Sequence, residues 1–148
     1  MTRRINERGL AIIKHYEGLR LKAYLCPAGV WTIGYGSTKR VTRGMTCTPA
    51  EAEARLLADV ADAEACVNRV NVELTDDQFS ALVSLVFNIG PTAFTASTLR
   101  RKLVAGDVNG AAEQFDRWVF AADKKLSGMI ARRASERALF EGRGVVLK

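Results

Sequence analysis

The stretch that decides the fold occupies residues 27–36 and reads PAGVWTIGYG. A Pro-Ala-Gly turn signal precedes β-branched and aromatic residues that are mixed with glycines, and this pattern predicts a β-hairpin. In a strand, Thr32 points away from the face that carries the aromatic side chains. Gly34 and Gly36 are expected to leave the Thr32 side open to an approaching ligand.

Helix signals lie on both sides of this hairpin. Asn6 is a suitable N-cap for a first helix that ends before the hairpin. Thr48 begins a capping box, TPAE, and apolar residues then recur at intervals of three and four, which predicts one connecting helix over about residues 48–70. Thr75 begins a second capping box, and it opens a core helix that stops at Gly90.

Further N-cap residues follow toward the C-terminus, so everything after residue 47 is expected to be helical. These candidate caps are Ser97 or Thr98, Asp107 and Ser127. The pattern predicts an α+β, mostly α, fold of one domain over residues 1–148. A small lobe with the hairpin sheet covers about residues 1–47, the connecting helix about 48–70, and a helical lobe about 74–148.

The composition suits one globular domain. The chain has 148 residues, of which 48% are hydrophobic and 26% charged, enough for a core without disulfide bonds. Three cysteines without a C-x-x-C pair fit neither a zinc site nor a disulfide framework. One histidine and scattered carboxylates predict no metal site, and no cofactor is expected.

Charge is distributed unevenly along the chain, whose formal net charge is +6. Residues 1–43 contain nine basic and two acidic side chains, residues 46–78 two basic and eight acidic, and residues 117–148 eight basic and three acidic. Two basic ends around an acidic helix favour a polyanionic partner. Nucleic acid, anionic lipid and an acidic cell-wall polymer all fit this description, and net charge alone does not choose among them.

Three polar side chains are candidates for chemistry. Glu17, at the end of the first predicted helix, shares a helix face with Leu10 and Ile13. A carboxylate held against apolar surface stays protonated more readily, as a general acid requires. Cys26 precedes the hairpin turn and Thr32 follows it, so these two approach each other across the turn. All three are therefore expected to converge on one cleft.

The residues around these candidates carry a resemblance. The sequence EGLRLKAY at residues 17–24, then Cys26 and GVWTIGYG at residues 29–36, resembles the catalytic region of the phage-type lysozymes, glycoside hydrolase family 24. The triad of that family is a Glu, eight residues, an Asp or Cys, five residues and a Thr. Glu17, Cys26 and Thr32 match this spacing. The resemblance spans nearly the whole chain, continuing in residues 74–82, 87–90, 117–118 and 132–137.

The resemblance implies a two-lobed lysozyme fold and the activity of a phage or prophage endolysin. Such an enzyme hydrolyses the β-1,4 bond between N-acetylmuramic acid and N-acetylglucosamine in bacterial peptidoglycan and lyses the host. Glu17 is expected to be the general acid, while Cys26 and Thr32 position and activate water on the opposite face of the sugar, with inversion. The residues expected to line the glycan cleft are Phe87, Ser97 and Gln114.

The expected partner is peptidoglycan, with no nucleic acid and no stable membrane insertion, and the chain is expected to act as a monomer. Its N-terminal residues contain an apolar run of only four residues and no small-residue cleavage site, so no secretory signal is predicted. This implies that the enzyme stays in the host cytoplasm until a membrane-permeabilising partner, a holin, gives it access to the wall in the periplasm.

Two positions depart from the commoner family pattern. The family more often has Asp at the position of Cys26, and its T-even member has His at the position of Ser37, so a His–carboxylate pair is expected to be absent. A thiol is largely neutral at pH 7 unless its pKa is lowered, and Arg20 or Lys22 is a candidate cation for this. A thiol nucleophile is less favoured, because a thioglycoside is a poor leaving species.

Three alternative functions remain. A lytic transglycosylase would cleave the same bond and leave a 1,6-anhydro end. A Cys/His peptidase would use Cys26 with His15, but His15 lies about 160° from Glu17 around the helix and is expected at the surface. A basic nucleic-acid-binding protein lacks a supporting motif, and its footprint would be Lys124, Lys125, Arg132, Arg133 and Arg137.

Overall fold

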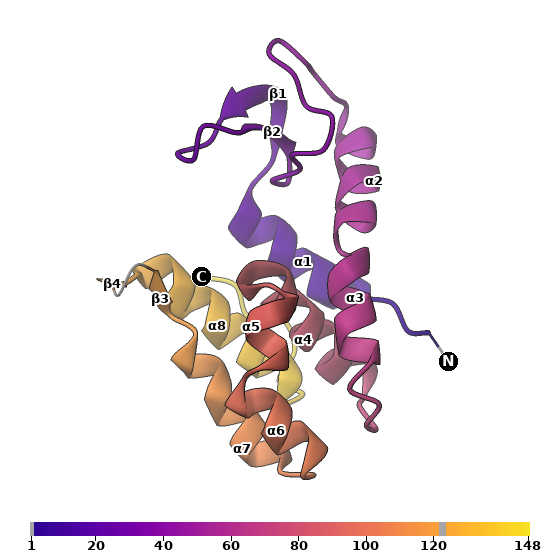
Figure 1. The fold of residues 1–148 in the computed structure, drawn as a ribbon, viewed down its shortest axis with the longest axis vertical. Helices are drawn as coiled ribbons and strands as arrows, with labels where there is room; N and C mark the ends of the chain where they lie inside the picture. The colour runs from indigo at the N-terminus through magenta and orange to yellow at the C-terminus, as the bar shows by residue number, and fades with distance from the viewer. Residues whose placement is uncertain (1, 122–123) are drawn as a thin grey trace. The chain divides into compact units, whose positions relative to one another are not determined.

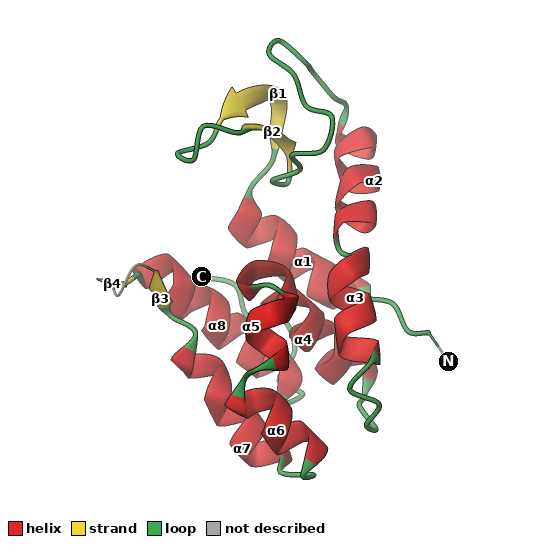
Figure 2. Ribbon diagram, viewed as in Figure 1, coloured by secondary structure: helices red, strands yellow, loops and turns green. Residues whose placement is uncertain are grey.

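The computed structural model describes residues 2–121 and 124–148, and it is mostly helical (Figures 1 and 2). The helices are α1 Glu7–Glu17, α2 Pro49–Asp59, α3 Ala61–Asn68, α4 Asp76–Ile89, α5 Pro91–Thr95, α6 Thr98–Val104, α7 Val108–Gln114 and α8 Ser127–Phe140, with a 3-10 helix at Phe115–Arg117. The strands are β1 Arg20–Leu25, β2 Trp31–Gly34, β3 Phe120–Ala121 and β4 Lys124–Lys125. The predicted α+β, mostly α, class is confirmed.

The chain forms two compact units. The hairpin unit comprises residues 14–61, and the helical unit comprises residues 1–13 together with residues 62–148. The sequence grouped all of residues 1–47 in one lobe, whereas the structure places the first 13 residues with the helices.

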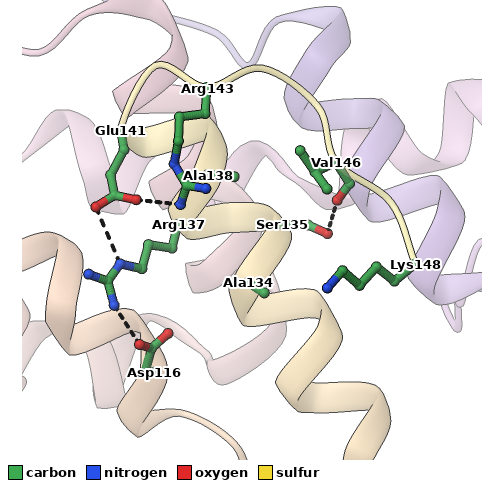
Figure 3. A pocket seen from close by; sticks show the side chains of 9 residues that line it. All are labelled: Asp116, Ala134, Ser135, Arg137, Ala138, Glu141, Arg143, Val146 and Lys148. Carbon is green, nitrogen blue, oxygen red and sulfur yellow. Dashed lines mark hydrogen bonds and ion pairs between the residues drawn. The ribbon is translucent and has the colours of Figure 1, made fainter.

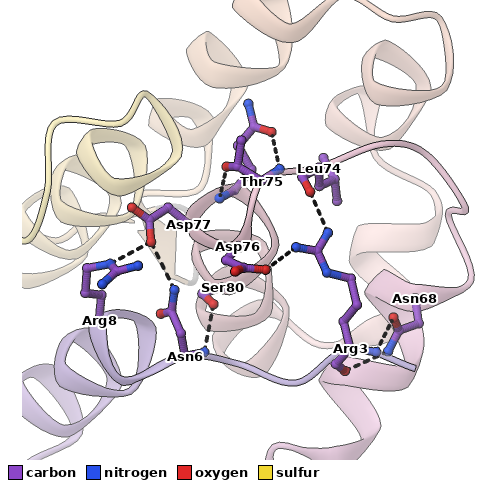
Figure 4. A network of polar contacts seen from close by, with 10 residues as sticks. Arg3, Asn6, Arg8, Asn68, Leu74, Thr75, Asp76, Asp77 and Ser80 are labelled. Carbon is purple, nitrogen blue, oxygen red and sulfur yellow. Dashed lines mark hydrogen bonds and ion pairs between the residues drawn. The ribbon is translucent and has the colours of Figure 1, made fainter. Parts of the chain in front are cut away.

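Polar contacts explain why the N-terminal segment belongs to the helical unit (Figure 4). The Asn6 side-chain oxygen accepts a hydrogen bond from the Gly9 amide at 2.9 Å, as expected of the predicted cap. The Asn6 side-chain amide donates to Asp77 at 3.0 Å, and its backbone amide donates to the Ser80 hydroxyl at 2.9 Å. Arg8 also donates to Asp77, at 2.7 Å. The start of α1 is thereby fastened to α4.

The hairpin unit contains the predicted hairpin. Strands β1 and β2 pair antiparallel, with Tyr24 opposite Thr32. The glycine at position 34 is not open to a ligand as predicted, because a Cβ there would lie 3.3 Å from the Ala52 Cβ. Gly34 instead allows β2 to approach α2 closely, and this expectation from the sequence was wrong.

The connecting segment is two helices rather than the single helix expected over residues 48–70. Thr48 caps α2 with the predicted capping box, formed with Glu51. Helix α2 then ends at Asp59, Val60 lies outside it, and α3 begins at Ala61. The buried apolar positions continue through this interruption, with Val60 only 1% exposed, so their spacing alone does not reveal it.

The core of the helical unit is built on α4. Thr75 caps this helix with the predicted capping box, and eight consecutive residues from Phe79 to Val86 are buried. Such a helix, buried on all sides, is typical of a core surrounded by other helices. Helices α4 and α8 pack together, as do α6 and α7.

A buried group of charges joins α8 to α4. The Glu136 carboxylate lies 3.1 Å from the Arg132 Nε and 2.7 Å from the Arg133 Nε, and it accepts a hydrogen bond from the Ser84 hydroxyl at 2.6 Å. Arg133 and Glu136 are fully buried. In such a group the attraction between opposite charges offsets the free energy lost when each charge is removed from water. Removing one charge leaves the others buried without a counter-charge.

The expectation that everything after residue 47 is helical was wrong at one place. Helix α7 ends at Gln114, and after the short 3-10 helix β3 pairs antiparallel with β4. The predicted cationic positions Lys124 and Lys125 belong to β4, but their side chains lie outside what the structure describes. Within the described chain, no helix is both long enough and apolar enough to span a membrane.

Candidate active site

Glu17 is the last residue of α1, where Gly18 ends the helix with a positive φ of 75°. Its side chain is half-buried. A Cβ built on Gly36 would lie 3.4 Å from the Glu17 Oε1, so the carboxylate lies directly beside the backbone after β2. Gly36 therefore leaves room for the carboxylate, which gives this glycine a role at the candidate acid.

Lys14 fixes the end of α1 that carries Glu17. Its ammonium forms an ion pair with Glu53 of α2 and lies 5.8 Å from the centre of the Tyr35 ring. Both contacts lie within the hairpin unit, and Lys14 stands one turn before Glu17 on α1. Lys14 was not predicted as a site residue, because its partners Glu53 and Tyr35 come near it only in the folded unit.

Cys26 and Thr32 meet across the hairpin turn, as the sequence predicted. The Cys26 amide donates to the Val30 carbonyl at 3.0 Å, and the Gly29 amide donates to the Cys26 carbonyl at 2.8 Å. Thr32 is only 4% exposed, and its hydroxyl donates to the Val30 carbonyl at 2.9 Å. This turn holds the thiol and the hydroxyl in a fixed arrangement.

The pKa of the Cys26 thiol is lowered from its ordinary value. The largest cause is hydrogen bonding from the Val30 amide, followed by the Ala28 amide, and the Thr32 hydroxyl contributes through a further hydrogen bond. Donors that point at the sulfur stabilise its charged form. The sequence suggested that a cation, Arg20 or Lys22, would lower this pKa, whereas in the structure the amides of the turn lower it. The Arg20 guanidinium instead lies over the Tyr24 ring, 4.7 Å from its centre.

The Thr32 hydroxyl has one proton and two neighbouring acceptors, the Val30 carbonyl and the Cys26 sulfur. When the hydroxyl donates to the carbonyl, its lone pairs remain able to accept a hydrogen bond. When the sulfur is ionised, rotation of the hydroxyl lets it donate to the thiolate instead. Cys26 and Thr32 can therefore form a pair that accepts and redirects a proton.

His15 is exposed, and its ring packs edge-on against Tyr16 at 4.7 Å between centres. This confirms its predicted surface position. Within the described residues, no group of three or more His, Cys, Asp or Glu side chains is arranged to hold a metal ion.

The residues expected to line a glycan cleft all lie in the helical unit. Phe87 on α4 and Gln114 at the end of α7 are half-buried. Ser97 is only 6% exposed and caps α6. Its hydroxyl donates to the Phe94 carbonyl at 2.6 Å and accepts from the Arg100 amide at 3.1 Å. Both hydrogen bonds are made to the backbone around the start of α6.

Comparisons with known proteins give a consistent result. The family model for phage lysozyme matches residues 14–136. An endolysin of Acyrthosiphon pisum secondary endosymbiont phage 1 is 51% identical over 142 residues, which cover 93% of this chain and 97% of that protein.

Solved structures show the same relationship. The endolysin from Escherichia coli O157:H7 phage FAHEc1 is 38% identical with a TM-score of 0.89, and the match covers 100% of this chain and 98% of that one. The muramidase domain of SpmX from Asticaccaulis excentricus is 39% identical with a TM-score of 0.87, over 93% and 97% of the two chains. The chain therefore belongs to the phage lysozyme family.

Proposed function

We propose that this lysozyme-type glycosidase hydrolyses the β-1,4 bond between N-acetylmuramic acid and N-acetylglucosamine and thereby lyses the host of a phage. Membership of the phage lysozyme family and 51% identity to an endolysin support a peptidoglycan-hydrolysing lysis enzyme. A structural relative is itself a muramidase domain. The observation that carries the assignment of residues is the placement of Glu17, Cys26 and Thr32 in one compact unit.

In the proposed mechanism Glu17 donates its proton to the glycosidic oxygen as the bond to C1 breaks. A water molecule attacks C1 from the opposite face and gives its proton to the Cys26 thiolate. Thr32 orients the water and the thiolate through its hydroxyl. The product carries a new reducing end with inverted configuration at C1.

The pair Cys26 and Thr32 favours hydrolysis over lytic transglycosylation. A transglycosylase uses the 6-hydroxyl of the muramic acid in place of water, and it has no need for a group that activates water. The turn amides that lower the pKa of Cys26 favour a thiolate able to accept the proton of water. This role as a base also needs no covalent glycosyl-thiol intermediate.

The test is mass spectrometry of peptidoglycan digests, combined with variants. Wild-type enzyme should release fragments with a reducing muramic acid end, and 1,6-anhydro ends would overturn hydrolysis. Glu17→Gln should lower the rate by about 10²–10⁴-fold, the range typical of a general acid. His15→Ala should retain activity, and its inactivation with retained fold would instead favour a Cys/His peptidase.

We assign Phe87, Ser97 and Gln114 to the glycan-binding surface as part of this proposal. Phe87→Ala and Gln114→Ala should raise KM more than they lower kcat, because neither side chain takes part in proton transfer. Ser97→Ala should mainly lower stability through loss of the α6 cap. A change of stability without any change of KM would remove Ser97 from the binding surface.

Access to the wall is proposed to depend on a holin, with the enzyme acting as a monomer. Cells that express the enzyme alone should stay intact until their inner membrane is permeabilised. Lysis without permeabilisation, or processed enzyme in the periplasm, would overturn it.

A further inference from the structure

The loop between the hairpin and α2 forms one wall of a basic pocket. The pocket has a volume of about 300 Å³ and lies within the hairpin unit. Its lining consists of loop residues and the C-terminal half of α2: Ser37, Lys39, Arg40, Arg55, Ala58 and Asp59. None of these residues has a role in the proposed reaction.

The Arg55 side chain is held in the pocket by hydrogen bonds. From α2 its Nη1 donates to the Lys39 carbonyl at 2.9 Å and reaches the Ser37 hydroxyl at 3.4 Å. Its Nη2 lies 3.9 Å from the Met45 sulfur, a weak acceptor. These neutral groups hold the guanidinium in place. The capping-box hydrogen bonds, and then the Arg55 charge, lower the pKa of the Glu51 carboxyl, one turn earlier on α2, although these two described side chains form no ion pair.

The charges of the lining are unbalanced. Lys39, Arg40 and Arg55 face one acidic lining residue, Asp59, which leaves an excess of two positive charges. Within residues 2–121 and 124–148, none of these three cations forms an ion pair. A concave basic surface of this kind attracts anions.

Another basic pocket, at the end of α8, provides a contrast (Figure 3). There Arg137 pairs with Asp116 at 2.5 Å and with Glu141 at 3.4 Å, and Arg143 pairs with Glu141 at 2.6 Å. These arginines already have counter-charges from the protein. An anion would have to displace carboxylates in that pocket, whereas it would find unpaired cations beside Arg55.

Arg40 adds an independent observation. Its φ is 54°, in the left-handed region that a residue with a Cβ adopts only at a cost. A glycine would meet no such cost at this position, yet the chain has an arginine there. Strain of this kind in a pocket wall is an indicator of function.

We propose that this pocket binds an oxyanion, a carboxylate or phosphate group of the bacterial cell wall, and so holds the hairpin unit on its substrate. Arg55 presents a planar fork that suits two oxygens, and Lys39 and Arg40 supply further charge. Ser37 connects the pocket to the active site, because it exchanges two backbone hydrogen bonds with Ile33 and follows Gly36, the neighbour of Glu17. The cell wall as the source of the anion rests on the proposed function.

The first test titrates the protein with inorganic phosphate and measures the NMR chemical shifts of its backbone amides. Chloride keeps the ionic strength constant. Phosphate should shift residues of the 37–45 loop and the end of α2. The double variant Lys39→Gln/Arg40→Gly should weaken binding by about fivefold or more, as expected for two exposed ion pairs. Arg40→Gly also relieves the backbone strain, so misfolding is not expected.

Arg43→Gln is the matched control. Arg43 lies in the same exposed loop and carries the same charge, but it does not line the pocket. Its replacement should change phosphate affinity by less than about twofold, through screened long-range attraction alone. An equal loss in the control and the double variant would overturn the pocket as a site, and so would shifts centred elsewhere.

The second test identifies the source of the anion, using Glu17→Gln protein so that binding is measured without cleavage. Retention on purified sacculi should fall at least about fivefold in the double variant and hardly change in the control variant. Converting the wall carboxylates to neutral amides with a carbodiimide and methylamine tests carboxylates, and removing wall-linked phosphate polymers with hydrofluoric acid tests phosphates. Retention that survives both treatments would overturn the wall as the source.

These outcomes are separable from failure of the proposed function. Release of reducing ends by the wild-type enzyme tests the reaction. It depends neither on the phosphate-induced shifts nor on retention measured with Glu17→Gln protein. A protein that binds phosphate but releases no reducing ends would keep the pocket and refute the glycosidase. The reverse result would keep the glycosidase and refute the pocket.

Discussion

Substituting Gly36 with alanine tests the contact between β2 and the candidate acid. The φ of Gly36 is +93°, so any residue with a Cβ is strained there by about 1–2 kcal/mol. The new methyl carbon would lie 3.4 Å from the Glu17 Oε1, which is ordinary contact rather than a collision. This distance is at the tight end of ordinary contact, so the carboxylate would move by at most about 0.3 Å. At about 100-fold per ångström of misplacement, activity should fall by up to about fourfold.

Two other glycines of the hairpin unit are controls for this substitution. Gly44 has a φ of +83° and no atom within 4 Å of a built Cβ, so Gly44→Ala should lose similar stability with activity unchanged. At Gly34 the built Cβ meets the Ala52 Cβ at 3.3 Å, and Gly34→Ala should lose more stability than either, about 2–4 kcal/mol.

The assay combines urea unfolding with initial rates of reducing-end release from purified peptidoglycan. Rates are compared well below the unfolding transition, so that lost stability does not appear as lost activity. If Gly36→Ala and Gly44→Ala have equal activity after equal losses of stability, the carboxylate does not depend on the space beside Gly36. The placement of Glu17 in the site would then be wrong.

Three further predictions concern single contacts. In protein whose other two cysteines are replaced by serine, the alkylation rate of Cys26 should rise with pH at a lower midpoint than for an ordinary thiol, because amide hydrogen bonds lower its pKa. Thr32→Val should move this midpoint to higher pH. An unchanged midpoint would show that the Thr32 hydroxyl does not stabilise the thiolate. Glu136→Gln should cost about 3–5 kcal/mol in urea unfolding, because two buried guanidinium groups lose their counter-charge, and a loss below about 1 kcal/mol would contradict this. Thr75→Ala should cost about 1 kcal/mol through loss of the α4 cap, whereas Thr75→Ser should be nearly neutral.

The features that sequence predicted well are those set by neighbouring residues. A capping box joins residues three apart, and both boxes, at Thr48 and Thr75, are present in the structure. The hairpin turn likewise follows from residues that prefer its conformation, and it brings Cys26 and Thr32 together. These elements therefore follow from local chemistry, without reference to tertiary contacts.

The features that sequence missed depend on partners distant in the chain. Gly34 reads as an opening in a strand, but its neighbour is Ala52, eighteen positions away. Lys14 has no signal of its own until α1, α2 and the hairpin are folded around it. The break at Val60 is invisible to periodicity, because the apolar face continues through it. At Gly34 and Lys14 the decisive contact is tertiary.

The turn at Cys26 shows how a thiol suits the role proposed for this position. The groups that stabilise the negative charge are mainly the amides of Val30 and Ala28, which are present whatever side chain stands at position 26. A thiolate and a carboxylate both accept such hydrogen bonds, and both can receive a proton from water. The identity of residue 26 sets the intrinsic pKa of the acceptor, and the turn amides then lower that pKa and favour the charged form. In the proposed mechanism Cys26 therefore requires neither a nucleophilic thiol nor a nearby cation.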